Sequence, residues 1–553
     1  MTTPLTPQAT QRTLLRGGYV HTPGSNSTGP HPTALCVEDG HVVWTGDDDA
    51  STHFADGADR VIELDGRLVT PAFVDSHAHL AQTGFAAAGV DLTTPATLHE
   101  ALDAIAAHAR ATTDAVVVGH GWDDTTWPEQ RPFTREELDR ATGGRPAYLA
   151  RVDEHSAVVS TAFLDVCPDV VHADGYDVTG RVERDAHHVA RDGLARLLTP
   201  SAREDAILRA LRLAAAQGIG MVHELGAPHI CPPEDLLVAQ SLSRTGALPE
   251  VVAYWGELAS DGAVQTAREL GAVGLAGDLC MDGSLGSWTS ALRAPYADHP
   301  HDPAHAGHLY VEAEQVTDHV LACTEAGLQA GFHVIGDRAV DAVVAGFEAA
   351  ATKIGDLAVV RGRHRLEHVE MVAPEHMATL GRLGVTASQQ PVFDALWGGG
   401  SDMYAQRLGA ERAAGMNAFA SLNRAGVALA FGSDSPVTPF GPWAAVRAAA
   451  WHRTPSERVT VRAAFNAHTR GGWRAAARDE GGVIDLGTPA SIAVWDVPGD
   501  LVVQTPDARV AAWSTDPRAG VPHLPDLHPD QDLPTCVLTM VHGQVAYERE
   551  GAL

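Results

Sequence analysis

Two histidines close a short apolar segment in the sequence Val74-Asp75-Ser76-His77-Ala78-His79. Residues two apart on a strand point to the same side of the pleat, so the imidazoles of His77 and His79 face one point. Two imidazoles in this arrangement are suitable ligands for one divalent cation. A His-x-His pair is weak evidence in a chain with 29 histidines, so its meaning depends on where the fold places it.

The sequence beyond this segment alternates short apolar runs with helical stretches rich in Ala, Leu and Arg. This alternation is typical of parallel strands joined by helices. The clearest helix is expected over 204–216, because its apolar residues fall on one face. Eight candidate strands can be counted, and they cover 72–76, 219–224, 250–255, 278–281, 329–335, 365–369, 385–389 and 427–432. Eight is the number that a TIM-like (β/α)₈ barrel requires, so the predicted fold class is α/β.

Both ends of the chain have a different pattern, with short β-rich runs separated by tight turns. Runs at 34–37 and 41–45 flank Glu38-Asp39-Gly40, and runs at 536–541 and 544–547 flank His542-Gly543. We therefore expect a small β-sandwich domain assembled from both chain ends. Its predicted extent is 1–69 plus 483–553, with the barrel over 70–482.

More than a hundred residues separate the first and second barrel strands, far more than one helix needs. This stretch contains its own candidate strands at 116–120 and 147–151. We interpret residues 81–200 as a subdomain inserted over the barrel mouth, where it would shape substrate access. The alternative is an appendage with only a packing role.

Composition limits the possible partners of the chain. It has 553 residues, of which 45% are hydrophobic and 20% charged, and a formal net charge of −31. That charge repels phosphates, so nucleic acid and anionic membranes are not expected as partners. The six cysteines show no Cys-x-x-Cys spacing, and residues 1–15 lack an apolar run of signal-peptide length. We expect a cytoplasmic protein with reduced thiols and a small-molecule substrate; a homodimer is favoured only by general frequency.

Three later residues occupy the same position as the His-x-His pair, at the ends of barrel strands. His333 ends the fifth strand, His368 the sixth and Asp434 the eighth. The carboxyl ends of all barrel strands meet at one face, so these side chains should converge. Together with His77 and His79 they predict a metal cage.

These segments resemble the amidohydrolase superfamily, and most closely its YtcJ-like branch (amidohydrolase family 3), which includes N-substituted formamide deformylase. The similar segments are Thr70-Pro-Ala-Phe-Val-Asp-Ser-His-Ala-His79, Asp282-Gly-Ser-Leu-Gly-Ser287, Gly331-Phe-His-Val-Ile-Gly-Asp337, Arg365-Leu-Glu-His368 and Gly432-Ser-Asp-Ser-Pro436.

The resemblance implies a role for each of these residues. His77 and His79 would hold one metal ion, and His333 and His368 would hold a second ion or complete the first site. Asp434 would bind metal and accept a proton from the attacking water. Zn²⁺ is the favoured ion, and a zinc-bound water has a pKa of about 7. Such histidine and aspartate ligands also accept Mn, Fe or Ni, so the identity of the metal stays open.

One position departs from the pattern of related sequences. Many two-metal members carry a lysine that is carboxylated to bridge the ions, and Asp278 stands at that place here. Aspartate cannot be carboxylated, so either one ion is bound or another carboxylate bridges two. Asp278 and Glu224 are the candidates, and one tightly held zinc is favoured over two.

Further residues are candidates for substrate contact. Asp282, Arg338 and Gln390 are predicted to lie beside the barrel mouth, although Arg338 could equally form a salt bridge. In the insertion, His155 belongs to a segment similar to the family's lid, and Trp122 could line an apolar pocket or be a core residue. The His187-His188 pair is interpreted as solvated loop histidines.

The predicted activity is metal-dependent hydrolysis of a non-peptide C–N bond in a small molecule, such as an amide or formamide. The alternative is hydrolytic deamination of a heterocycle. Deaminases of this superfamily commonly have a glutamate just after the fifth-strand histidine, and none occurs within four residues after His333. A scaffold without catalytic activity would not need the full set of ligands.

Overall fold

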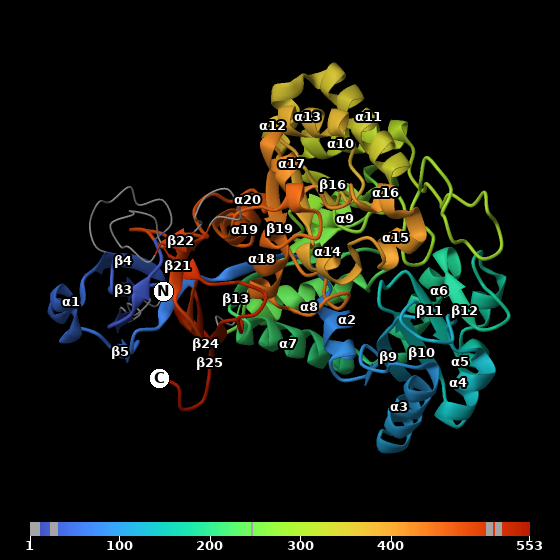
Figure 1. The fold of residues 1–553 in the computed structure, drawn as a ribbon, viewed down its shortest axis with the longest axis horizontal. Helices are drawn as coiled ribbons and strands as arrows, with labels where there is room; N and C mark the ends of the chain where they lie inside the picture. The colour runs from blue at the N-terminus through green and yellow to red at the C-terminus, as the bar shows by residue number, and fades with distance from the viewer. Residues whose placement is uncertain (1–10, 23–30, 245–246, 505–512, 515–522) are drawn as a thin grey trace, which may run out of the picture.

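The computed structural model of the chain describes residues 11–22, 31–244, 247–504, 513–514 and 523–553. The expected cytoplasmic location was argued in part from residues 1–15, and residues 1–10 of that segment lie outside the described ranges. Figure 1 shows three regions side by side along the longest axis, with the terminal strands at one end, the barrel in the middle and the inserted segment at the other end.

The barrel is an eight-stranded parallel sheet in the order β19-β18-β17-β16-β15-β14-β13-β7. Its strands, in chain order, are β7 (Phe73–Ala78), β13 (Ile219–Gly226), β14 (Glu250–Trp255), β15 (Gly274–Leu275), β16 (Gln329–Val334), β17 (Arg365–His368), β18 (Thr386–Gln389) and β19 (Ala428–Phe431). The Asp434 amide donates to the His77 carbonyl at 2.8 Å and joins the last strand to the first. The predicted α/β barrel with both additions is confirmed.

One predicted strand was misplaced. The fourth strand was expected over 278–281 but lies at β15, Gly274–Leu275, and the expected segment keeps only an isolated parallel bridge between Cys280 and His333. The chain leaves the ladder at Gly277, whose φ of 86° suits glycine and turns the backbone toward the barrel mouth. Asp278 therefore follows the strand instead of beginning it.

Helices cover the outside of the barrel, which explains why strands such as β13 are buried along their whole length. The predicted helix over 204–216 is confirmed as α7 (Pro200–Ala216), capped by Thr199 and packed through the Ile207 side of its surface. The others are α2 (Leu80–Ala86), α8 (Pro233–Ser243), α9 (Ala263–Leu270), α10 (Ala313–Ala326), α11 (Asp337–Ile354), α12 (Asp356–Gly362), α13 (Pro374–Arg382), α14 (Pro391–Trp397), α15 (Met403–Leu408), α16 (Ala410–Ala413), α17 (Phe419–Arg424), α18 (Pro442–Ala450), α19 (Val461–Ala467) and α20 (Arg470–Ala475).

The segment between β7 and β13 builds a separate five-stranded sheet in the order β12-β11-β10-β9-β8. Its elements are β8 (Val90–Asp91), α3 (Leu98–Ala111), β9 (Val117–Trp122), α4 (Arg135–Thr142), β10 (Ala147–Arg151), β11 (Ser156–Val159), α5 (Thr161–Val166), β12 (Arg181–Glu183) and α6 (Arg184–Leu197). The His187-His188 pair lies on α6, and His187 is buried, so its interpretation as a solvated loop residue was wrong.

Strands from both chain ends pair with each other. One sheet has the order β4-β3-β1-β5, a second β2-β6-β20-β24-β25 and a third β22-β21-β23. Their bounds are β1 (Arg12–Arg16), β2 (Tyr19–Val20), β3 (Ala34–Glu38), β4 (His41–Gly46), α1 (Asp48–Ala55), β5 (Arg60–Glu63), β6 (Leu68–Pro71), β20 (Ile492–Asp496), β21 (Leu501–Gln504), β22 (Trp513–Ser514), β23 (Leu524–Pro525), β24 (Thr535–Val541) and β25 (Gln544–Glu548). Residues from the first two sheets, including Leu35, Val69 and Leu538, share one hydrophobic core.

Among the described residues, no helix combines the length and apolarity that a membrane span needs.

Candidate metal centre

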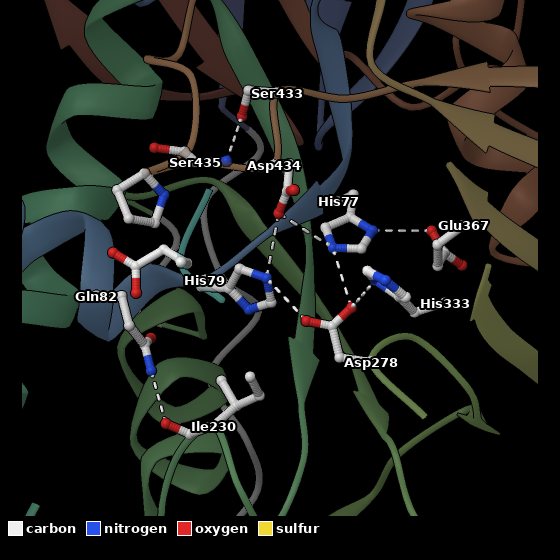
Figure 2. Close-up of polar contacts among 12 residues, drawn as sticks. His77, His79, Gln82, Ile230, Asp278, His333, Glu367, Ser433, Asp434 and Ser435 are labelled. Carbon is white, nitrogen blue, oxygen red and sulfur yellow. Dashed lines mark hydrogen bonds and ion pairs between the residues drawn. The ribbon is translucent and has the colours of Figure 1, made fainter. Parts of the chain in front are cut away.

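Four side chains meet at the carboxyl end of the barrel. The His77 Nε2 atom lies 3.4 Å from Asp278 Oδ1 and 3.3 Å from Asp434 Oδ1. The His79 Nε2 atom lies 3.2 Å from Asp278 Oδ2 and 3.3 Å from Asp434 Oδ1. Figure 2 shows the two carboxylates approaching the imidazoles from opposite sides. We call these four residues the metal cluster.

The backbone at the cluster is held in an uncommon conformation. His368 and Asp434 have φ values of 67° and 57°, in the left-handed region that non-glycine residues seldom adopt. Each such residue costs about 1–3 kcal/mol and persists only where its surroundings impose it. At Asp434 the backbone bond to His77 and, at the next residue, the bond between Ser435 N and Ser433 Oγ help to impose it.

Buried polar groups fix the orientation of the His77 imidazole and of the neighbouring His368 imidazole. His77 Nδ1 hydrogen bonds to Glu367 Oε2 at 3.0 Å, and Arg365 donates to both carboxylate oxygens of Glu367. His368 Nδ1 bonds to Gln390 Oε1 at 2.8 Å. These bonds use the Nδ1 atoms and leave both Nε2 atoms directed into the cluster, the arrangement typical of metal-ligating histidines.

The electrostatics of the cluster reflect its close carboxylates. Burial disfavours a charged imidazole, but Asp434 and Asp278 outweigh this and raise the pKa of His77 well above its usual range. The same balance raises the pKa of His79 to about 10. Burial and the neighbouring positive charges lower the pKa of His368 to about 3, which leaves this imidazole neutral. Protons on the imidazoles therefore balance the negative charge of the two carboxylates, as a bound metal cation would.

The residues fit a metal ion by their unpaired atoms. Among the described residues, His77 Nε2, Asp278 Oδ1 and His368 Nε2 are buried and have no hydrogen-bond partner. Leaving buried polar atoms unpaired is costly, so a ligand is expected there. Two sets of three residues have donor atoms close enough for one ion: His77, His79 and Asp434, and His77, Asp278 and His368.

Three members of the metal cluster, His79, Asp278 and Asp434, lie at the floor of a cavity between the barrel and the insertion. His333 lies in its wall, with Nδ1 3.8 Å from Asp278 Oδ1. His155 enters from the insertion, and its ring centroid lies 5.1 Å from that of His333. Further lining residues include Gln82, His188, Arg191, His229, Cys280 and Tyr310.

The two carboxylates proposed as bridging candidates occupy different places. Asp278 belongs to the metal cluster and faces three histidines, as Figure 2 shows. Glu224 is buried behind His79 and accepts the Leu80 amide with Oε2 at 2.8 Å. The geometry therefore favours Asp278 at the place of the missing lysine.

The structure does not bring all the predicted substrate contacts to the cavity. Asp282 is buried and accepts the amides of Ala291, Ile335 and Gly336. Arg338 is exposed on α11. The lining of the cavity includes neither of these two residues.

The other two predicted contacts are buried away from the cavity. Trp122 is buried in the core of the insertion, where its indole donates to the Leu149 carbonyl. Gln390 acts through His368, as described above. Of the predicted set, His155 is the residue that the structure places in the cavity wall.

Sequence reasoning did not identify Glu367, Arg365 or the cavity histidines that lie outside the barrel strands, such as His229. Glu367 stands one residue before His368, and its carboxylate bonds to His77 while the His368 ring lies 4.9 Å from the His77 ring. The sequence feature that could have revealed Glu367 is a charged residue within a strand that is buried on both faces. His229 had no comparable signal, because it lies in a loop after β13.

The amidohydrolase family pattern matches residues 60–547, most of the chain. The chain belongs to the amidohydrolase family. This confirms the resemblance inferred from the motifs, and members of the family are hydrolases.

Individual relatives agree with this placement. The chain is 25% identical over 471 residues to YtcJ of Bacillus subtilis (strain 168), with 81% of this chain and 85% of that protein covered. It is 25% identical over 495 residues to N-substituted formamide deformylase of Arthrobacter pascens, with 84% and 90% covered. A solved structure of an uncharacterized metal-dependent hydrolase from Pyrococcus furiosus superposes with a TM-score of 0.68 at 26% identity, covering 87% of this chain and 98% of that chain.

Proposed function

We propose that this protein is a metal-dependent hydrolase that cleaves a non-peptide C–N bond of a small amide or formamide. The observation that carries the proposal is the metal cluster, in which buried imidazoles and carboxylates converge with unpaired atoms at the barrel mouth. The relative named N-substituted formamide deformylase and the solved metal-dependent hydrolase support it.

His77, His79, Asp278 and Asp434 would hold the ion, with His368 completing the set. Nitrogen and carboxylate donors of this kind suit Zn²⁺. A divalent cation held there supplies Lewis-acid chemistry, because it polarises a carbonyl and acidifies a water molecule.

The geometry favours one ion over two. Both sets of possible ligands include His77, and its Nδ1 atom already bonds to Glu367. Only Nε2 remains, and an imidazole nitrogen binds one metal ion. The two sets therefore describe alternative positions for one ion.

Asp434 is the proposed proton carrier. Its carboxylate lies within 3.3 Å of both His77 and His79, and its position at the cavity floor exposes it to water and substrate. In the proposed reaction it accepts the proton of the attacking water and returns it to the departing nitrogen. His155 and His333, in the cavity wall, would face the substrate.

The test combines metal analysis with product analysis. Purified protein should contain about one transition-metal ion per chain, lose activity on chelation and regain it with Zn²⁺. His77→Ala should lose the ion, whereas His99→Ala, which changes an exposed histidine on α3, should keep it. N-substituted formamides should release formate and amine, whereas release of ammonia from a heterocycle would favour a deaminase. Protein without metal, unchanged by added Zn²⁺, would contradict the proposal.

A further inference from the structure

A groove with a volume of about 800 Å³ lies between the barrel and the insertion, apart from the cavity at the metal cluster. The linings of the two spaces share only Pro436 and Val437, and none of the four metal-cluster residues lines the groove. Its volume falls within the roughly 300–1,000 Å³ common for ligand sites. We call this space the insertion groove.

Large apolar side chains line the insertion groove from several elements. Leu213 on α7 and Leu396 on α14 are 41% and 53% exposed, although leucine is usually buried. Trp127 from the insertion, Trp397 from α14 and Phe440 complete this apolar wall. Exposed apolar surface gathered around a concave space is typical of a binding site, so we expect the ligand to have an apolar part.

Three carboxylates line the same groove, at Asp91, Asp123 and Asp402. Asp91 ends β8 and Asp123 directly follows β9, and these strands pair in parallel, so both carboxylates lie at one edge of the sheet. Asp91 Oδ1 accepts the Thr93 amide at 2.9 Å, and Asp123 Oδ1 accepts the Thr125 amide at 3.0 Å. These turns hold one oxygen of each carboxylate and leave the other without a partner in the described part of the chain.

The negative charge of these carboxylates is only partly balanced. No described lysine or arginine lines the insertion groove. Asp402 precedes α15 and makes no capping hydrogen bond. Arg151 pairs with Asp123 from outside the groove at 2.9 Å, and His120, which lines the groove, bonds to the Glu154 carboxylate at 2.6 Å. Carboxylates beside apolar walls focus their field on a concave surface, so the groove attracts a cation.

The cation that fits this surface is organic. Among the described residues, the groups with donor atoms close enough for one metal ion include none of the three groove carboxylates. An ammonium group on an apolar body satisfies both the carboxylates and the apolar wall. Aromatic rings such as those of Trp127 and Trp397 also attract cations.

We propose that the insertion groove is a second ligand site, which binds an organic ammonium ion. The apolar body of the ligand lies against Leu213, Leu396 and the aromatic side chains, and its ammonium group faces the carboxylates of Asp91, Asp123 and Asp402. The groove is separate from the metal cluster, so this inference does not depend on the proposed reaction.

The test compares 2-phenylethylammonium with 2-phenylethanol and 3-phenylpropanoate, which keep the ring and the chain but are neutral or negative. Binding is measured by calorimetry on the metal-loaded protein. The ammonium ion should bind about tenfold tighter than the alcohol, because three exposed carboxylates each contribute a modest attraction. Added salt should reduce this advantage, since it screens exposed charges.

Variants of the carboxylates test the charge. Asp402→Asn should reduce the advantage of the ammonium ion by about 1.5- to 5-fold, the effect of one exposed ion pair. Asp91→Asn keeps an acceptor for Thr93 and should have a similar effect, and the two changes together should remove most of the advantage. Asp56→Asn, which changes an exposed aspartate after α1, is the control.

A blocking variant tests the place of binding. Ala87, at the end of α2, is exposed and lines the insertion groove. Ala87→Trp should fill the groove and weaken the ammonium ion and the alcohol alike by at least about tenfold. Ala88→Trp, at the next exposed residue, lies outside the groove lining and should leave binding as it is. Circular dichroism checks that each variant is folded.

The source of the ligand is tested by turnover. Hydrolysis of an N-substituted amide also releases an ammonium ion of this kind. Inhibition of N-phenethylformamide turnover by 2-phenylethylammonium that disappears in Ala87→Trp would identify the released amine as the ligand. Binding without inhibition would identify an amine from another source, and both results support the site.

Two results would overturn the proposal. One is equal binding of the ammonium ion and the alcohol to the wild type. The other is ammonium binding that is unchanged in both Ala87→Trp and the Asp91→Asn/Asp402→Asn double variant, because that binding would belong to the cavity at the metal cluster. Absence of formamide turnover would contradict the proposed reaction and would leave the binding measurements unaffected.

Discussion

Two regions supply histidines to the same cavity, and they differ in their surroundings. The barrel places His77 and His79 at strand ends between two carboxylates, which raise the pKa of both imidazoles. The insertion places His187 and His188 on α6 near Arg191, where burial and that cation lower the pKa of both. The barrel is therefore built to hold positive charge, whereas the insertion offers neutral rings. This division suggests catalysis on the barrel and substrate selection by the insertion.

The strongest test of this division is Asp434→Asn on the barrel. Loss of the proton carrier should lower kcat by about 10²–10⁴-fold while the bound ion remains, since the amide oxygen can still serve as a ligand. Steady-state kinetics and metal analysis measure both effects. Asp318→Asn, an exposed aspartate on α10, is the control. Full activity in Asp434→Asn would remove its assigned role.

The matching test on the insertion is Arg151→Met. Arg151 is 1% exposed and pairs with Asp123, Asp124 and Asp153 at 2.9–3.2 Å. Removing it leaves buried carboxylates unpaired and should destabilise the insertion by about 3–5 kcal/mol. Hydrogen exchange should show lost protection in residues 81–200 with the barrel intact. Arg131→Met, an exposed arginine, should have little effect; equal loss of protection in the barrel would show that the two regions unfold together.

A smaller effect is expected from Glu367→Gln, which leaves every proposed ligand in place. The change weakens the bond that orients His77 and should lower metal affinity by about 10–100-fold. Competition with a chelator measures this affinity, and Glu348→Gln on α11 is the surface control. An unchanged affinity would mean that Glu367 serves only the packing of the barrel interior.

The smallest effect concerns acid and the insertion. Burial, followed by Arg191, lowers the pKa of His188 from about 6.5 to about 4. The unfolded form of the insertion therefore binds more protons than the folded form between pH 4 and pH 6.5. The stability of the insertion is consequently full above pH 6.5 and falls as the pH drops toward 4. His188→Gln should remove up to about 2 kcal/mol of this loss between pH 7 and 5.

Hydrogen exchange of the α6 amides at both pH values provides the measurement. His99→Gln, an exposed histidine in the same insertion, should leave the pH dependence as it is. If His188→Gln and the wild type lose equal protection, the acid response belongs to other groups.

Position in the barrel made much of the site predictable. His77, His79, His333, His368 and Asp434 follow recognisable apolar strands, and the carboxyl ends of parallel strands meet at one face. The strand before Asp278 was misplaced because β15 is only two residues long, too short to show a pattern.

Side-chain direction explains the remaining differences. A tryptophan such as Trp122 has the same sequence signal whether it faces a cavity or a core, and the fold places it in the core. Glu367 acts through His77, so no motif of its own identified it.

The pairing of β6 with β20 has a consequence for protein synthesis. Trp495 donates from its indole to the Thr70 hydroxyl at 2.9 Å across 425 residues of sequence. At about 5–20 residues per second, the ribosome needs roughly 20–85 s to deliver the second partner after the first. During that interval one edge of β6 is unpaired. An unpaired strand edge can pair with another chain and cause aggregation unless a chaperone covers it. Slowing translation near residue 490 should therefore increase the time that the nascent chain spends bound to chaperones.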